Sequence, residues 1–327
     1  MVALYVTSFA SGNGKTAFCS GLGRYFLDSG RKVGFLKPTF AGALLGGGTD
    51  RDAELMKIIL TLEESVEDIC PVFTDLNNLV VGIKGAYARV SQGKDVVIIE
   101  GPPEKGVVGA LGVKSVMVEG YSQELVRGID RAKDMGEYLL GVVLNKVPSS
   151  RLGYVRGEIA TQFSRAGVNI LGILPEDRVL CSLAVDELTR HIQGELLSGA
   201  GKSMELVENI MLGAMSVDSG IYYFGRKANK AVVIKSERSD AQLAALETSI
   251  SCLVLVGDTA PKPVVLQQAE DKSIPVILAK GDIATVAINI ERALSTTSFN
   301  REKMPRFIEI MGQNFNFEAL DNGLWFG

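Results

Sequence analysis

The residues with the clearest chemistry in this sequence form a short run near its start, Ser11-Gly12-Asn13-Gly14-Lys15-Thr16. Small residues let backbone N–H groups curl around an anion, a lysine reaches terminal phosphates, and a threonine hydroxyl at a helix N-terminus can hold Mg²⁺. The run therefore predicts a phosphate-binding loop (P-loop) for a nucleoside triphosphate, with Lys15 as a catalytic candidate. The usual spacing, G-x-x-x-x-G-K-[ST], would place its first glycine at Phe9, so only the second half of the pattern fits.

Four more polar residues lie where an apolar strand is expected to end or a helix to begin, namely Lys37, Asp52, Glu100 and Asn145. Because open parallel sheets bind ligands beyond the carboxyl ends of their strands, these side chains are expected near the loop. Glu100 and Asp52 are predicted to hold Mg²⁺ together with Thr16. Lys37 would neutralise a phosphate or a substrate carboxylate as a second catalytic candidate, and Asn145 would contact a base.

Each of these residues also has a purely structural interpretation. Asp50 or Asp52 would cap the N-terminus of a helix, since a carboxylate accepts hydrogen bonds from the first free N–H groups. Glu100 and Asn145 would be ordinary solvated ends of strands. The glycine-rich segment 41–50 has no periodicity and is expected to be a mobile loop under either interpretation.

The elements that must position these residues follow from the apolar pattern of the first half. Short apolar runs alternate with helical patterns, which predicts an α/β fold of the P-loop type, with a mostly parallel sheet and helices on both faces. Strands are expected at residues 3–6, 33–36, 95–101, 115–118, 139–145 and 170–174. Helices are expected at 16–28, from 52 onward and at 80–90, and the domain is expected to span residues 1–193.

A stretch rich in glycine, at residues 194–203, is expected to be a linker. Its Gly201-Lys202-Ser203 imitates the end of a P-loop, but no strand precedes it. A smaller α/β domain is expected at 204–294, with strands at 210–212, 230–235, 252–255 and 276–278 and helices at 240–248, 263–271 and 282–294. The tail, 295–327, is apolar enough that it is expected to pack on the protein or on a partner.

Composition and charge argue against several classes of function. The 327-residue chain is 46% hydrophobic, carries a formal net charge of −4 and has no block of Lys or Arg, so neither nucleic acid nor an anionic membrane is expected as a partner. The single histidine, His191, is expected at the surface, which disfavours triad and metal-cluster chemistry. Four cysteines without CxxC spacing are expected to be reduced thiols. A cytoplasmic protein is expected, because no basic leader or long apolar run is present.

The first half resembles the dethiobiotin synthetase-like P-loop family, especially the form found at the N-terminus of long bacterial phosphate acetyltransferases. Besides the loop, the similarity lies in residues 32–38, 50–54, 99–101, 143–147 and 171–177. In that family the glycine that opens the loop corresponds to Ser8. The resemblance implies ATP with Mg²⁺, roles for Lys37, Asp52 and Glu100 toward substrate and metal, and a homodimer.

Two departures from the synthetases follow Glu100. This chain reads Gly101-Pro102-Pro103-Glu104-Lys105 where the synthetases have a glycine-rich segment that shapes the substrate pocket. The interval from there to the strand at Ser115 is also too short for the usual intervening helix. Dethiobiotin synthesis itself is therefore not predicted.

The second half resembles the DRTGG domain that accompanies the same P-loop domain in those acetyltransferases. The matching residues are 213–216, 229–231 and 237–248, although Glu237 replaces the aspartate and Val256-Gly257-Asp258 stands where the family has Thr-Gly-Gly. Ser239 and Gln242 have the spacing of a helix capping box, and the alternative is a ligand at the Arg238 turn.

Three functions are compatible with these residues. The first is a regulatory or interaction protein that responds to ATP, with or without slow ATPase activity, and whose partner is an acyl-transfer enzyme. The second is a synthetase-like enzyme that uses ATP to activate a carboxylate or carbamate. The third is a degenerate P-loop protein that binds no nucleotide, which the residues Ser8 and Phe9 at the start of the loop suggest.

Overall fold

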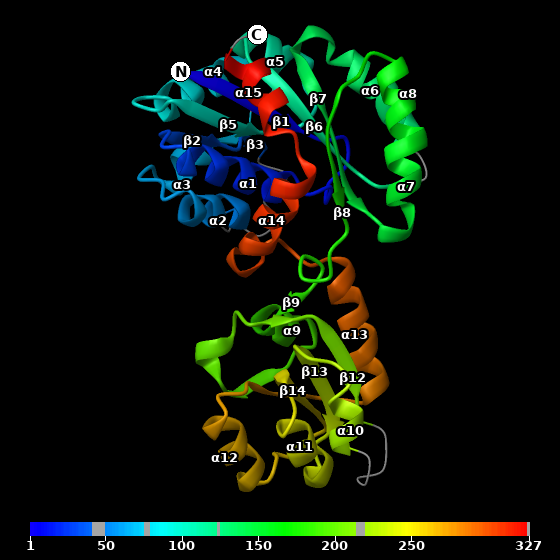
Figure 1. Cartoon of the computed structure of the whole chain (residues 1–327). Helices are drawn as coiled ribbons and strands as arrows, with labels where there is room; N and C mark the ends of the chain where they lie inside the picture. The colour runs from blue at the N-terminus through cyan, green and yellow to red at the C-terminus, as the bar shows by residue number, and fades with distance from the viewer. Residues whose placement is uncertain (41–49, 75–78, 123–124, 214–219, 326–327) are drawn as a thin grey trace. The chain divides into compact units, whose positions relative to one another are not determined.

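The computed structural model describes residues 1–40, 50–74, 79–122, 125–213 and 220–325 and divides into two compact units (Figure 1). The first unit consists of Met1–Glu176 together with Phe299–Gly327, and the second consists of Asp177–Ser298. The second unit thus begins before the boundary expected at residue 193. Most of the glycine-rich segment 41–50 and residues 214–216 of the predicted DRTGG match lie outside the described residues.

A six-stranded sheet in the order β2-β5-β1-β6-β7-β8 forms the centre of the first unit, and all of its strand pairs are parallel. Its strands are β1 (Val2–Thr7), β2 (Val33–Leu36), β5 (Val96–Glu100), β6 (Lys114–Gly120), β7 (Leu139–Val147) and β8 (Ile170–Pro175). Residues 96–100 are all buried, as expected for a strand covered on both faces. A short parallel pair, β3 (Thr39–Phe40) with β4 (Val72–Phe73), lies outside this sheet.

Helices cover both faces of this sheet, which confirms the predicted fold class. Alternate residues of β1 face opposite sides, and Ala3 and Tyr5 join a core cluster with residues of the helices that follow β4. Those helices are α4 (Leu79–Val90), α5 (Lys105–Leu111), α6 (Gly128–Asp134), α7 (Leu152–Tyr154) and α8 (Ala160–Arg165). The other helices before the second unit are α1 (Lys15–Asp28), α2 (Arg51–Ile59) and α3 (Val66–Ile69). The interval before Ser115, expected to be too short for the usual intervening helix, holds the seven-residue helix α5.

The C-terminal tail belongs to the first unit and forms α14 (Met304–Asn314) and α15 (Phe317–Trp325). Phe307 and Met311 of α14 are each 1% exposed and pack on Gly21 of α1, where an added Cβ would lie 3.1 Å from the Phe307 ring. The apolar residues of the tail therefore cover the helix that begins at the P-loop.

The second unit contains a five-stranded sheet in the order β10-β15-β14-β13-β12. Its strands are β10 (Glu195–Ser198), β12 (Asn209–Leu212), β13 (Lys230–Lys235), β14 (Ile250–Val256) and β15 (Val276–Ala279), and a small pair is formed by β9 (Leu183–Ala184) and β11 (Leu206–Val207). The expected linker at 194–203 is therefore corrected, because β10 pairs antiparallel with β15 at the edge of the sheet.

Helices also cover both faces of the second sheet, and each face has its own core cluster. On one side lie α10 (Gly220–Phe224), α11 (Ser239–Leu246) and α12 (Pro263–Asp271), and on the other lie α9 (Val185–His191) and α13 (Ile283–Ser295). The expected capping box is wrong, because Gln242 Nε2 donates to the carbonyl oxygens of Lys235 (2.8 Å) and Ser236 (3.0 Å) instead. No helix in the described part of the chain is long and apolar enough to cross a bilayer.

Candidate nucleotide site

The P-loop lies where the strand order of the first sheet reverses. From β1 the chain passes through α1 to β2, which lies beyond β5, whereas the connection from β5 to β6 crosses to the other side of β1. Such a switch point opens a crevice beyond the carboxyl ends of the neighbouring strands. Glu100 at the end of β5 and Glu119 near the end of β6 therefore flank the loop that follows β1.

The loop ends at a helix N-terminus whose N-cap is a glycine. Gly14 is the N-cap of α1, with a left-handed φ of 91°, and no side-chain cap hydrogen bond is present there among the described residues. The first N–H groups of an α-helix lack partners within the helix and carry its positive dipole end, so they attract an anion. Lys15 and Thr16 are the first two residues of this helix. The local structure is therefore suited to binding a phosphate group.

Two donors at the end of β7 hold the loop carbonyl groups. Asn145 Nδ2 lies 2.8 Å from the carbonyl oxygen of Asn13, and Lys146 Nζ lies 2.8 Å from that of Gly12. In a trans peptide the C=O of one residue and the N–H of the next point in opposite directions. The N–H groups of Asn13 and Gly14 consequently point away from these donors, which is the orientation that an anion-binding loop requires.

Asn145 was expected either to contact a base or to be a solvated strand end. It is 6% exposed, so the solvated strand end is wrong, and its amide contacts the backbone of the loop. Lys146 was not among the predicted site residues, and its φ of 55° is rare for a residue with a side chain. Its only signal was a lysine directly after a predicted site residue.

The predicted metal ligands converge on one hydroxyl group. Thr16 Oγ1 lies 3.0 Å from Glu100 Oε1 and 3.2 Å from Asp52 Oδ2, although the three residues come from α1, β5 and α2. Glu100 is 4% exposed and its Oε2 atom has no hydrogen-bond partner among the described residues. A buried carboxylate oxygen without a partner is costly unless a ligand or water completes it.

Asp50 caps a helix, whereas its neighbour Asp52 lies at the candidate metal position. Asp50 is the N-cap of α2, and its Oδ1 atom accepts a hydrogen bond from the Ala53 N–H at 3.0 Å. Asp52 is the second residue of the helix and turns toward Thr16. The capping interpretation therefore applies to Asp50, whereas Asp52 lies at the candidate metal position.

Lys37 balances the negative charge of this cluster. Its Nζ atom lies 2.9 Å from Asp50 Oδ1 and 2.7 Å from Asp52 Oδ2. Burial by itself would lower the pKa of Lys37, but the carboxylates of Glu100 and Asp52 outweigh it and raise that pKa above its usual value. Burial raises the pKa of Glu100 to about 7, with Lys37 opposing the shift and Asp52 adding to it.

These oxygen atoms suit Mg²⁺, which prefers hard oxygen ligands and is commonly held by one or two carboxylates together with substrate phosphates and water. No group of three or more His, Cys, Asp or Glu residues that could hold a metal was found among the described residues. Two carboxylates, one of which has an unpartnered oxygen among the described residues, and one hydroxyl group therefore fit a Mg²⁺ that arrives with a nucleotide better than a metal bound by protein alone.

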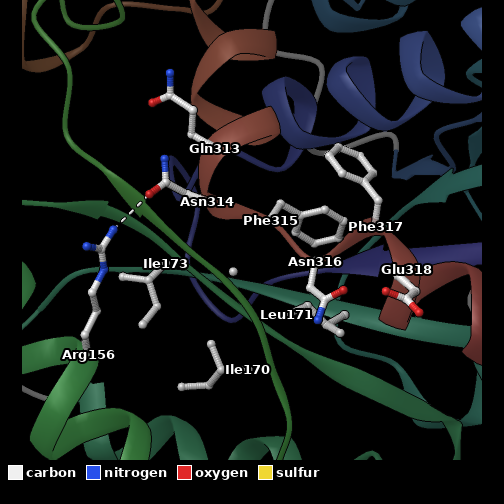
Figure 2. A pocket seen from close by; sticks show the side chains of 11 residues that line it. Arg156, Ile170, Leu171, Ile173, Gln313, Asn314, Phe315, Asn316, Phe317 and Glu318 are labelled. Atoms are coloured by element: carbon white, nitrogen blue, oxygen red, sulfur yellow. Dashed lines mark hydrogen bonds between the residues drawn. The ribbon is translucent and has the colours of Figure 1, made fainter.

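The hollow shown in Figure 2 lies elsewhere in the first unit. It has a volume of about 640 Å³ and lies against the edge strand β8, between Ile170–Ile173 and residues 313–318. Arg156 Nη2 donates to Asn314 Oδ1 across one end, at 2.9 Å. None of the predicted site residues lines this hollow. The predicted site residues therefore lie at the loop and not at this hollow.

Comparison with known families gives two matches along the chain. The CobQ/CobB/MinD/ParA nucleotide binding domain matches residues 4–189, and the DRTGG domain matches residues 187–293. The first match covers more than half of the chain, and the second coincides largely with the second unit.

Similar curated proteins include phosphate acetyltransferases. That of Pseudomonas aeruginosa is 23% identical over 365 residues, which cover 98% of this chain and 52% of the relative. That of Haemophilus influenzae is 20% identical over 368 residues, which cover 96% of this chain and 51% of the relative. The chain therefore spans about half the length of these relatives. Among solved structures, the MinC:MinD cell division protein complex of Aquifex aeolicus aligns with a TM-score of 0.38 and 19% identity, over 55% of this chain and 84% of the other.

Proposed function

Because this chain belongs to the CobQ/CobB/MinD/ParA nucleotide binding domain family, we propose that its P-loop binds ATP together with Mg²⁺. One observation carries the proposal. Thr16, Asp52 and Glu100 meet beside the N-terminus of α1, and one buried oxygen of Glu100 has no partner among the described residues. A cation held between these oxygens and a phosphate group would complete that arrangement.

The residues of the site divide into four roles in this proposal. Residues 11–16 would surround the phosphates, with Lys15 placed to stabilise charge on the terminal groups. Thr16, Asp52 and Glu100 would hold Mg²⁺, which supplies charge neutralisation to the phosphate oxygens when it is bound. Lys37, freed from part of its pairing with Asp52, would neutralise a phosphate or a carboxylate. Asn145 would contact a base only through the N–H of its side-chain amide that does not donate to Asn13.

We further propose that the protein is a regulatory one that responds to nucleotide. The support is the combination of a nucleotide-binding family domain with a DRTGG domain, and the similarity to one half of phosphate acetyltransferases. An acyl-transfer enzyme is accordingly the proposed partner, and a homodimer is the proposed assembly. Co-purification with acyl-transfer enzymes encoded nearby would test the partner, and light scattering with and without Mg²⁺-ATP would test the assembly.

The alternative is a synthetase-like enzyme, and the position of Lys37 favours it. The ammonium group of Lys37 lies beside the proposed metal ligands, where it could also hold a substrate carboxylate. The departure of Gly101-Pro102-Pro103 from the glycine-rich segment of the synthetases argues against dethiobiotin synthesis, and this segment is held to β1 by the hydrogen bond that Tyr5 Oη donates to the Pro102 carbonyl oxygen at 2.9 Å. ATP turnover that requires an added amine or carboxylate metabolite would favour this enzyme over the regulatory protein.

Thermal unfolding with and without Mg²⁺-ATP tests the proposal. A ligand that binds only the folded state at about a hundred times its Kd stabilises it by about 2.7 kcal/mol, so a clear rise in Tm is expected for the wild type and none for Lys15→Ala. Lys202→Ala is the matched control, because Lys202 belongs to the imitation motif at 201–203 and forms an exposed ion pair with Glu205. No rise in the wild type, or an equal rise in Lys15→Ala, would leave the degenerate P-loop as the better explanation.

A further inference from the structure

Glu119 places a buried carboxylate against two residues of the loop that follows β1. It is 8% exposed, and its Oε1 atom accepts a hydrogen bond from the Phe9 N–H at 2.9 Å. Its Oε2 atom accepts one from Asn13 Nδ2 at 3.2 Å. One side chain from β6 therefore contacts two loop residues that are four positions apart.

Ser8 completes this network from inside the loop. Its Oγ atom accepts a hydrogen bond from Asn13 Nδ2 at 2.8 Å and donates to the Ala10 carbonyl oxygen at 2.9 Å. Gly120 lets Asn13 approach β6, because a Cβ at position 120 would lie 2.6 Å from Asn13 Oδ1. The side chain of Asn13 is thus held by Ser8 and Glu119, while its carbonyl group is held by Asn145.

The charge of Glu119 is unfavourable for binding an anion. Burial raises the pKa of its carboxyl group, while the Phe9 N–H and the charges of Arg131 and Lys15 oppose the shift. Arg131 also lies over the Phe9 ring, with its guanidinium carbon 5.1 Å from the ring centroid. A carboxylate beside a phosphate site repels the ligand, so its contribution to binding must come from the hydrogen bonds that it accepts.

We propose that Glu119 is a positioning residue, which fixes residues 9 and 13 so that the P-loop is already shaped for phosphate before the ligand arrives. The proposal rests on the proposed function, because the loop is taken to bind nucleotide. It assigns the effect of Glu119 to its role as a hydrogen-bond acceptor and not to its charge. The ligand affinity and the order of the loop should therefore change together.

Two measurements on the full chain test this assignment, namely amide hydrogen exchange at Phe9 without nucleotide and the Kd for Mg²⁺-ATP. Glu119→Ala is expected to speed exchange at Phe9 and to weaken ATP binding by about tenfold or more, since hydrogen bonds to charged groups are worth about that much. Glu119→Gln is expected to keep Phe9 protected and to bind ATP more tightly than Glu119→Ala, because its single amide oxygen can still accept from the Phe9 N–H although the acceptor for Asn13 is lost. Glu158→Ala, at an exposed site, is the matched control.

The outcomes separate this inference from the function on which it rests. The positioning role would be overturned if Phe9 in Glu119→Ala exchanged as slowly as in the wild type. It would also be overturned if Glu119→Ala and Glu119→Gln lost equal affinity for Mg²⁺-ATP. If Glu119→Ala does not fold, Asn13→Ala replaces it, with an expected loss of affinity of at least about threefold, and wild-type affinity in that variant overturns the inference. Failure of the wild type to bind ATP would refute the proposed function, while the exchange at Phe9 would still decide whether Glu119 orders the loop.

Discussion

The hydroxyl group of Thr16 lies 3.0 Å from Glu100 Oε1, which joins the start of α1 to the end of β5. These two residues are 84 positions apart in the chain, and parallel pairing of β1 with β5 brings them together. The same hydroxyl contacts Asp52, so the fold itself gathers the oxygens suited to Mg²⁺.

Asp50 and Asp52 form a matched pair for testing the metal site. Asp52→Asn is expected to weaken ATP binding by roughly tenfold or more with Mg²⁺ present and far less with EDTA, because a metal ligand is lost. Glu100→Gln should behave in the same way. Asp50→Asn should change the ATP affinity little, whether Mg²⁺ or EDTA is present, since asparagine caps a helix as well as aspartate does. Titration calorimetry gives the ATP affinity with Mg²⁺ and with EDTA. Equal losses of affinity in the two conditions would refute the role of Asp52 and Glu100 as metal ligands.

Gly14 is expected to be the least replaceable glycine of the loop. Alanine would be strained by about 1–2 kcal/mol at its φ of 91°, and its Cβ would also collide with Asn145 Nδ2. Gly12→Ala has a comparable φ of 76° but no neighbour within 4 Å, so it controls for backbone strain alone. We expect Gly14→Ala to abolish the rise in Tm with Mg²⁺-ATP, and Gly12→Ala only to reduce it.

The collision at Gly14 can be separated from strain with a double variant. Asn145→Ala removes the colliding amide, so its loss of affinity and that of Gly14→Ala should combine to less than their sum. The measurement is the Kd for Mg²⁺-ATP in the two single variants and the double variant. Losses that simply add would contradict the close contact between Gly14 and Asn145.

The hydrogen bond between Tyr25 and Asp321 is expected to anchor the C-terminal tail on α1. Tyr25 Oη donates to Asp321 Oδ2 at 2.6 Å, and Asp321 Oδ1 is buried without a partner among the described residues. Tyr25→Phe removes the donor and should lower the free energy of unfolding by roughly 1.5–3 kcal/mol, measured by urea denaturation. In an Asp321→Ala background, Tyr25→Phe should lower the free energy of unfolding much less. An equal decrease in both backgrounds would show that the hydrogen bond contributes little.

Lys230 is expected to make the stability of the protein rise at alkaline pH. It is fully buried, donates to Thr248 Oγ1 (3.0 Å) and to the Ser249 carbonyl oxygen (2.6 Å), and its burial lowers its pKa from 10.5 to about 8. Between those two pH values the unfolded chain holds a proton that the folded chain has released, so the free energy of unfolding increases with pH. Below about pH 8 both states are protonated and the burial penalty is fully present.

Urea denaturation across this range checks the prediction for Lys230. Lys230→Met should abolish the increase, whereas Lys235→Met, at the exposed end of the same strand, should keep it. The comparison of the two variants removes the contribution of other groups that titrate in the same range. A pH profile of Lys230→Met that matches that of Lys235→Met would contradict the assignment.

The sequence by itself determined the fold class and predicted which residues form the candidate site. Apolar runs such as residues 96–99, buried on both faces, are typical of parallel strands, and polar residues at strand ends are then expected at one edge of the sheet. This reasoning correctly brought Thr16, Asp52 and Glu100 together, because each follows from local pattern plus a single rule of sheet topology.

Only the tertiary structure decided what each residue contacts. Asp50 and Asp52 differ by two positions on one helix, and capping by one of them leaves the other facing Thr16. Lys146 and Glu119 reach the loop from strands that are distant from it in the sequence. The stretch expected to be a linker contains β10, which pairs with β15, a strand much later in the chain. The physical reason is that local periodicity encodes only which face of an element a side chain occupies. The partners of that side chain depend on the strand order and on backbone conformations such as the positive φ of Lys146. Residue spacing encodes neither the strand order nor these conformations.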